Sequence, residues 1–80
     1  MGKKVIMNLH KLLDERNMSM RKLSLLSGVR LAALHALANQ QRQNIHFRHI
    51  ERIAEALKLN DINELITWID TDDHDDDVDD

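Results

Sequence analysis

The chain has 80 residues, no cysteine and a formal net charge of −3. This length suits one small domain near the lower limit for a self-supporting core, and it argues against a large cleft between domains. Without cysteine, disulfides and thiolate metal sites are excluded, and no apolar run approaches the ~18 residues of a membrane span. We therefore expect a cytoplasmic protein that has no cofactor and does not contact a membrane.

The net charge conceals two segments of opposite sign. All eleven Lys and Arg residues precede Asp70 and are accompanied there by six acids, so the first 69 residues carry +5. The last eleven residues hold eight Asp and no Lys or Arg, and carry −8. A basic body suits the phosphate backbone of DNA, whereas a run of like charge is typical of a solvated tail. We predict a folded DNA-binding domain over residues 1–69 and an acidic, disordered tail over 70–80.

The N-terminal part of the chain is predicted to form an arm and a helix. Residues 1–7 form the arm, whose apolar Val5 and Ile6 are expected to cover the core. A helix is predicted over 8–16, because three leucines recur there at helical spacing and share one face. They are Leu9, Leu12 and Leu13.

The next segment has the spacing of a helix-turn-helix motif. Ser19 is suited to cap a helix over 20–27, in which Leu23 and Leu26 lie three apart and face inward. Gly28 follows, where a tight turn between two crossing helices needs a residue that tolerates φ > 0. We therefore predict the turn of the motif at this glycine.

The second helix of the motif is predicted over 30–38. Val29 closes the corner before it, and Leu34 and Leu37, again three apart, face the core. The remaining face is the one that a recognition helix presents to a DNA groove. It consists of Leu31, Ala32, His35 and Ala36.

Two more helices complete the predicted fold. One begins near Phe47 and has an apolar stripe formed by Ile50, Ile53, Ala54 and Leu57. The other is opened by Asp61 and Glu64, which form a D-x-x-E version of the capping box. Its inward residues are expected to be Ile62, Leu65, Ile66 and Ile69. The sequence thus predicts an all-α fold, a compact bundle of five short helices whose second and third helices form the helix-turn-helix.

These residues resemble the Cro/repressor-type helix-turn-helix family of phage and bacterial DNA-binding regulators, which is also called lambda-repressor-like or XRE-like. The resemblance runs from about residue 8 to residue 66. It rests on the succession of helical patterns with a glycine at the turn. Residues 50–57, which read I-x-x-I-A-x-A-L, are similar to the family's L-x-x-I-A-x-A-L pattern. The resemblance implies a transcriptional regulator, here a repressor, that binds double-stranded DNA as a homodimer on a palindromic operator. Such a protein is expected to be nucleoid-associated.

Residues on and around the motif are the predicted DNA contacts. Arg and Gln side chains are shaped for bidentate contacts with base edges and phosphates, and in this chain Met20 replaces the Gln with which the family usually opens the first motif helix. The predicted base contacts are Met20, Leu31, Ala32, His35, Ala36 and Gln40. Six predicted phosphate contacts match positions where the family grips the DNA backbone: Arg16, Arg21, Lys22, Arg42, His46 and Arg48. Arg30 and Gln43 join them because of their side-chain chemistry.

Two features leave alternatives open. Trp68 lies one position off the apolar stripe of the last predicted helix, so it fits core packing and, together with Ile69, a symmetric dimer contact. The acidic tail is consistent with a solvated segment that makes no contact with the body of the protein. It is also consistent with a segment that folds over the basic body and competes with non-specific DNA.

Two functions of different classes remain open as well. The +5 charge of the body favours a DNA-binding regulator. Met20 and the alanine-rich 30–38 helix favour a protein-interaction module of antitoxin or anti-repressor type, which would bind its protein partner through the apolar helix face or the acidic tail. An enzyme is not expected, because no nucleophile–base–orienter set can be assembled. The five histidines lack a cysteine or carboxylate at ligand spacing, so no metal site is expected.

Overall fold

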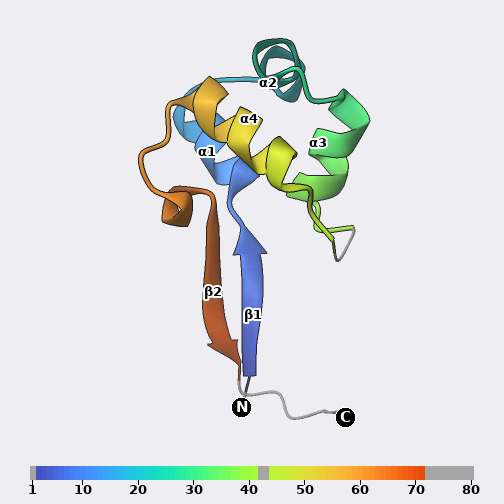
Figure 1. Cartoon of the computed structure of the whole chain (residues 1–80). Coiled ribbons are helices and arrows are strands. Elements are labelled where there is room, and N and C mark those ends of the chain that lie inside the picture. Colours follow the sequence, from blue (N-terminus) through green and yellow to red (C-terminus); the bar gives the residue numbers. More distant parts are fainter. Residues whose placement is uncertain (1, 42–43, 72–80) are drawn as a thin grey trace.

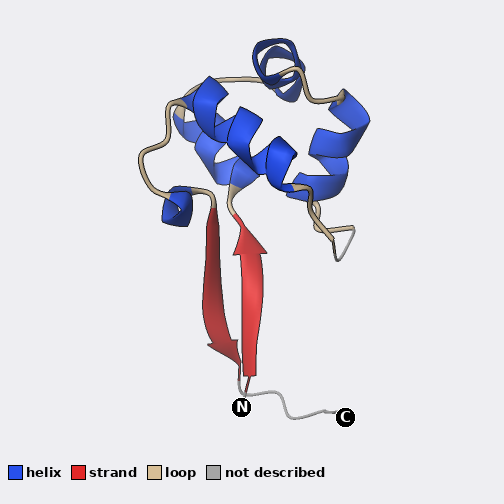
Figure 2. Ribbon diagram, viewed as in Figure 1, coloured by secondary structure: helices blue, strands red, loops and turns tan. Residues whose placement is uncertain are grey.

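A computed structural model of the chain describes residues 2–41 and 44–71. Its elements are, in order, β1 (Gly2–Met7), α1 (Leu9–Glu15), α2 (Met20–Ser27), α3 (Leu31–Ala38), α4 (Phe47–Leu57), the 3-10 turn η1 (Ile62–Glu64) and β2 (Ile66–Thr71). The helices pack as one body, and the two strands extend from it side by side (Figure 1). Figure 2 shows this separation of helices from strands, and we call the strand pair the ribbon.

The helices of the motif form where local signals place them. Ser19 Oγ accepts a hydrogen bond of 3.0 Å from the Lys22 backbone N–H and caps α2 as predicted. Gly28 ends α2 at a φ of 75°, the left-handed conformation that glycine tolerates. Even the longest helix in the described part of the chain, α4 with 11 residues, is too short to cross a membrane.

The hydrophobic core lies between the helices and includes the end of β1. Most of its members belong to the predicted apolar stripes, and Val29 closes the corner of the motif as expected. The buried apolar residues are Met7, Leu9, Leu12, Leu13, Leu23, Val29, Leu34, Ala38, Ile53, Leu57 and Leu65. Leu37 and Ile50 pack against this core while remaining half-buried.

The prediction of an all-α bundle of five helices is wrong. Residues 66–71 form β2, which pairs antiparallel with β1, so that Val5 lies opposite Trp68 and Met7 opposite Ile66. The expected arm over 1–7 is therefore a strand from Gly2 onward. Five of the six residues of β2 are Ile, Thr or Trp, which pack well in a pleated sheet. The apolar residues of 62–69 have the spacing of a helix, but the pairing of β2 with β1 determines the structure instead.

The predicted capping box is present but opens only a single 3-10 turn. Asp61 Oδ1 accepts a bond of 2.9 Å from the Asn63 N–H, and Glu64 Oε2 accepts one of 3.2 Å from the Asp61 N–H. The chain then bends into β2, so the inward stripe ends at the buried Leu65 and the half-buried Ile66. Two residues predicted to face inward, Ile62 and Ile69, are exposed instead.

Leu26 is also more exposed than predicted. The inward stripe of α2 consists of Met20, Leu23 and Ser27, which follow one another at helical spacing. At about 100° of rotation per residue, Leu26 falls on the flank of that stripe. Its side chain is therefore exposed on the surface of α2.

Candidate nucleic-acid interface

Two serines of α2 fix the corner from which α3 departs. Ser24 Oγ donates a hydrogen bond of 2.7 Å to the Val29 carbonyl oxygen, and Ser27 Oγ accepts one of 3.1 Å from the Val29 N–H. Both backbone groups of Val29 are thus satisfied while its side chain is buried. Leucine spacing alone locates the motif but gives no sign of these bonds.

The outward face of α3 is narrow and carries small side chains. Ala32 and His35 are exposed, whereas Leu31 and Ala36 are half-buried. All four were predicted to contact bases, and these contacts remain predictions. A face whose exposed members are a methyl group and an imidazole allows the helix backbone to come close to a groove.

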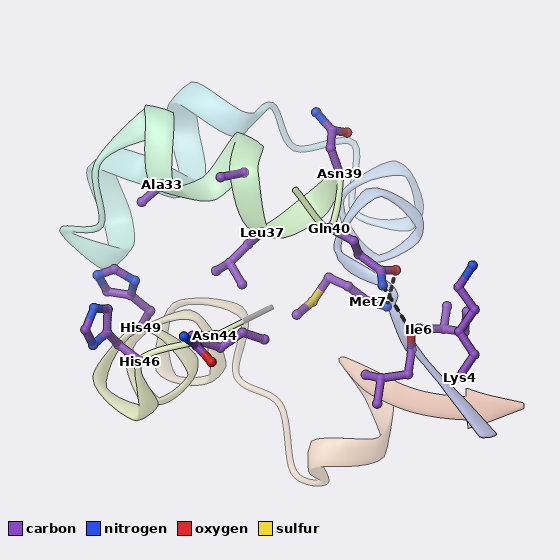
Figure 3. Close-up of a pocket in the computed structure, with 13 residues that line it drawn as sticks. Lys4, Ile6, Met7, Ala33, Leu37, Asn39, Gln40, Asn44, His46 and His49 are labelled. Atoms are coloured by element: carbon purple, nitrogen blue, oxygen red, sulfur yellow. Dashed lines mark hydrogen bonds between the residues drawn. The ribbon is translucent and has the colours of Figure 1, made fainter. Parts of the chain in front are cut away.

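The other two predicted base contacts are already engaged within the domain. Met20 is half-buried against the core. Gln40 follows α3 and bonds the backbone of β1 through both ends of its amide (Figure 3). A base contact by Gln40, which remains a prediction, would have to replace these bonds.

A basic hollow lies beside the turn, between the N-terminal ends of α3 and α4. Its volume is about 520 Å³. The cationic and titratable residues that line it are Arg30, His46, Arg48, His49 and Arg52. Three of these were predicted as phosphate contacts, and the hollow adds His49 and Arg52 to them. Arg52 follows Arg48 by four residues on α4, a spacing that places both side chains on one helix face.

Backbone donors add to the positive character of this hollow. Arg30 and His46, the residues at the N-terminal caps of α3 and α4, make no side-chain cap bond. The first N–H groups of a helix lack intrahelical partners, and the helix dipole favours an anion beside them. An arrangement of this kind is suited to a phosphate group.

His46 and His49 form an edge-to-face pair within the hollow. Their ring centroids are 5.2 Å apart, with an angle of 76° between the ring planes. Burial lowers the pKa of His49 below its ordinary value of 6.5, and the charges of His46 and Arg52 lower this pKa further. An anion bound in the hollow would raise the pKa of His49, because it would favour the charged imidazole.

The remaining predicted phosphate contacts are dispersed around the motif. Arg21 and Lys22 are exposed on the first turn of α2. Arg16 donates a bond of 3.4 Å through Nη2 to the Leu57 carbonyl oxygen and so supports the C-terminal end of α4. Arg42 and Gln43 lie outside the described residues.

The two predicted dimer contacts occupy opposite faces of the ribbon, because successive side chains alternate along a strand. Trp68 lies opposite Val5, and 64% of Trp68 and 49% of Val5 are exposed. Ile69 lies opposite Lys4 on the other face. Trp68 therefore does not pack in the core, and its role as a dimer contact stays open.

Comparison with known proteins places this geometry in a family. The chain matches no curated protein and no solved structure significantly. A family model of the Cro/C1-type helix-turn-helix DNA-binding domain matches residues 8–71, which include both motif helices, the basic hollow and β2. The resemblance inferred from the sequence is thereby confirmed. The chain belongs to the Cro/C1-type helix-turn-helix DNA-binding family.

Proposed function

We propose that the protein is a sequence-specific transcriptional repressor of phage or bacterial type. In this proposal α3 enters the major groove, and binding alone, without catalysis, controls transcription. The observation that carries the proposal is the position of the basic hollow, which adjoins the N-terminal end of α3 and shares Ala32 with its exposed face. A groove-bound helix needs phosphate contacts at such a position to fix its register.

Each part of the interface has a distinct task in this proposal. Ala32 contacts a thymine methyl group, and His35 forms a hydrogen bond with a base edge. Arg30, Arg48 and the first N–H groups of α3 and α4 hold one phosphate in the hollow. Arg21 and Lys22, at the start of α2, contact a neighbouring phosphate of the backbone.

The proposal is tested by selecting duplexes from a random-sequence pool and titrating the selected duplex and a random one at several salt concentrations. Arg48→Ala should weaken binding to both duplexes alike and reduce the slope of log affinity against log salt by about one unit. Lys58→Ala is the matched control, because it removes the same charge at the C-terminal end of α4, the end opposite to the hollow.

Two results would contradict the proposal. Equal effects of Arg48→Ala and Lys58→Ala would mean that the hollow does not hold a phosphate. If the wild-type chain enriches no sequence from the pool, it does not read DNA sequence.

We further propose that the regulator acts as a homodimer on half-sites about 34 Å apart. A sheet of only two strands is marginally stable alone and presents unpaired edges. Val5 and Trp68 are exposed side by side on one face of the ribbon, next to the Lys3–Asp70 ion pair, so a second copy seated on this face would remove an indole from water. Symmetric pairing through one face is the ordinary arrangement of a two-fold dimer.

A protein-interaction module is the second candidate function, and one observation favours it. The neighbouring Leu25 and Leu26 on α2 are 79% and 52% exposed, and paired exposed leucines are typical of a surface that contacts another protein. Failure of the DNA selection, together with a partner whose binding is lost in Leu25→Asp, would favour this function over the repressor.

A further inference from the structure

The turn that follows α3, the proposed recognition helix, contains a residue with an unfavourable backbone conformation. Gln40 has a φ of 53°, in the left-handed region. Its N–H donates a bond of 3.0 Å to the Leu37 carbonyl oxygen, and the Gln41 N–H donates one of 2.9 Å to that of Ala36. This pair of bonds defines a Schellman motif, in which the left-handed position is usually glycine. The chain therefore has a side chain at a position where glycine would adopt the left-handed conformation with less strain.

Both ends of the Gln40 side-chain amide are hydrogen-bonded to β1. Gln40 Oε1 accepts a hydrogen bond of 3.0 Å from the Met7 N–H, and Gln40 Nε2 donates one of 3.0 Å to the Val5 carbonyl oxygen. Figure 3 shows both bonds reaching from the end of α3 to the strand. The amide pairs with the outer edge of β1 as a residue of a neighbouring strand would. Glycine would suit the turn but could make neither bond.

The two bonds join elements that have different tasks. β1 belongs to the ribbon, whereas α3 is the helix that the proposed function places in the major groove. The same helix end is also tied to α1, because His10 Nε2 and Asn39 Oδ1 share a hydrogen bond of 3.0 Å. The C-terminal end of α3 is thus held on two sides.

We propose that Gln40 is a positioning residue, which clamps the end of α3 to β1 and thereby sets the angle at which α3 meets DNA. The inference rests on the proposed function, because that function assigns α3 to the groove. It also gives Gln40 a role different from a direct base contact. A helix displaced at one end loses base contacts, while its phosphate contacts depend mainly on charge.

One backbone amide reports the clamp directly. The N–H and C=O groups of Val5 and Met7 face away from β2, whereas those of Ile6 between them face β2. The Asn8 N–H agrees with this alternation, because it bonds the Leu65 carbonyl oxygen at 2.7 Å. Hydrogen exchange at Met7 therefore measures the clamp, and exchange at Ile6 measures the pairing of the ribbon.

The test uses Gln40→Gly in the full chain, because glycine keeps the left-handed turn and removes both bonds. We expect the Met7 amide to exchange at least tenfold faster and the Ile6 amide to change by less than twofold. Affinity for the duplex that the wild-type chain selects from a random pool should fall about tenfold, and affinity for a random duplex by less than twofold. Lys58→Gly is the matched control, since Lys58 has a φ of 56° at the end of α4. It should leave all four values unchanged.

Gln40→Glu is a second, milder variant that tests the two bonds separately. A carboxylate still accepts from the Met7 N–H but cannot donate to the Val5 carbonyl oxygen. The Met7 exchange rate of Gln40→Glu should lie between those of the wild type and Gln40→Gly. Its preference for the selected over the random duplex should also be intermediate, because the added negative charge weakens binding to both duplexes alike.

Any of four results would overturn the inference. Unchanged Met7 exchange in Gln40→Gly would mean that the clamp does not exist, and faster exchange with unchanged affinity for the selected duplex would remove the positioning role. A loss of preference at a single base pair would identify Gln40 as a base contact instead. If the wild type selects no duplex, the proposed function and the role of Gln40 in presenting α3 both fail, while Met7 exchange still decides whether the clamp exists.

Discussion

Arg52 Nη1 lies 3.0 Å from the position that a Cβ atom would occupy at Gly28. The guanidinium of α4 therefore covers the turn between α2 and α3, and it also lines the basic hollow beside that turn. Any side chain at residue 28 would be strained by the φ of 75° and would in addition meet this guanidinium. The turn of the motif and its basic surface are thus in direct contact.

Gly28→Val should lower the free energy of unfolding by more than about 1 kcal/mol. The left-handed conformation costs an L-residue about 1–2 kcal/mol, and a β-branched side chain tolerates it least. Urea denaturation of Gly28→Val and Gly28→Ala measures the loss. Repeating Gly28→Ala in an Arg52→Ala background separates the backbone strain from the contact with the guanidinium. A valine variant as stable as the wild type would show that the turn does not require this conformation.

Ser27→Ala should destabilise the motif by about 1–3 kcal/mol, because it leaves the buried Val29 N–H without its acceptor. Ser24→Ala, which removes a donor from the Val29 carbonyl oxygen, should cost about 0.5–1.5 kcal/mol. Leu25→Ala is the control on the same helix, since its side chain is 79% exposed and its loss should change stability by less than about 0.5 kcal/mol. Equal urea midpoints for Ser27→Ala and Leu25→Ala would contradict the role of Ser27.

The part of the fold that sequence predicts correctly depends on neighbouring residues. Ser19 and Gly28 bound α2, and both act within a few residues of their own position. Leu23, Val29 and Leu34 are spaced so that one short turn brings them together in the core. Such local rules suffice for the motif, because each bond or contact there spans few residues.

The ribbon was missed because its pairing is not local. Met7 pairs with Ile66, and no spacing within either segment indicates the other. The isoleucines of residues 62–69 also fit a helical stripe, and only the β-branched and aromatic content of β2 favours a strand. The clamp by Gln40 was missed for the same reason, since a glutamine that bonds a distant strand cannot be distinguished in sequence from one that faces DNA.

The stability of the domain should fall when the pH drops below about 6.5. Burial lowers the pKa of His49 in the folded state, so the unfolded chain binds more protons between that lowered pKa and 6.5. The stabilising effect of neutral His49 is complete above 6.5 and is lost as the pH falls toward the folded value. Urea unfolding at several pH values measures this, and His49→Gln should show a smaller loss. Parallel pH profiles for the two proteins would argue against a shifted His49.

Trp68→Ala should dissociate the proposed homodimer, whereas Ile69→Ala should not. The two residues are adjacent on β2 but lie on opposite faces of the ribbon, and of the two only Trp68 shares a face with Val5. Light scattering should give the wild type and Ile69→Ala twice the chain mass of 9.3 kDa and Trp68→Ala the mass of one chain. A dimer that survives Trp68→Ala but not Ile69→Ala would place the interface on the other face.

Removal of residues 72–80 should strengthen binding to every DNA duplex by the same small factor. The segment holds seven Asp and lies outside the described residues. Truncation after Thr71 leaves β2 complete and keeps the 2.6 Å ion pair between Lys3 Nζ and Asp70 Oδ1. Runs of like charge repel one another and stay solvated. Such a tail repels any duplex, and salt screens this repulsion beyond about 10 Å at 0.1 M.

A tail that instead covers the basic hollow would act selectively, and the same protein distinguishes the two cases. Non-specific binding depends mainly on charge, whereas binding to a selected duplex adds base contacts. A covering tail would therefore compete more strongly with random DNA, and its removal at low salt would raise affinity for the random duplex more than for the selected one. The backbone amides near Arg30, Arg48 and His35 would shift on truncation as well. Replacing the seven Asp with Asn keeps the length of the tail and should reproduce the truncation if charge is its only effect. Unequal gains for the two duplexes, accompanied by these amide shifts, would contradict a passive tail.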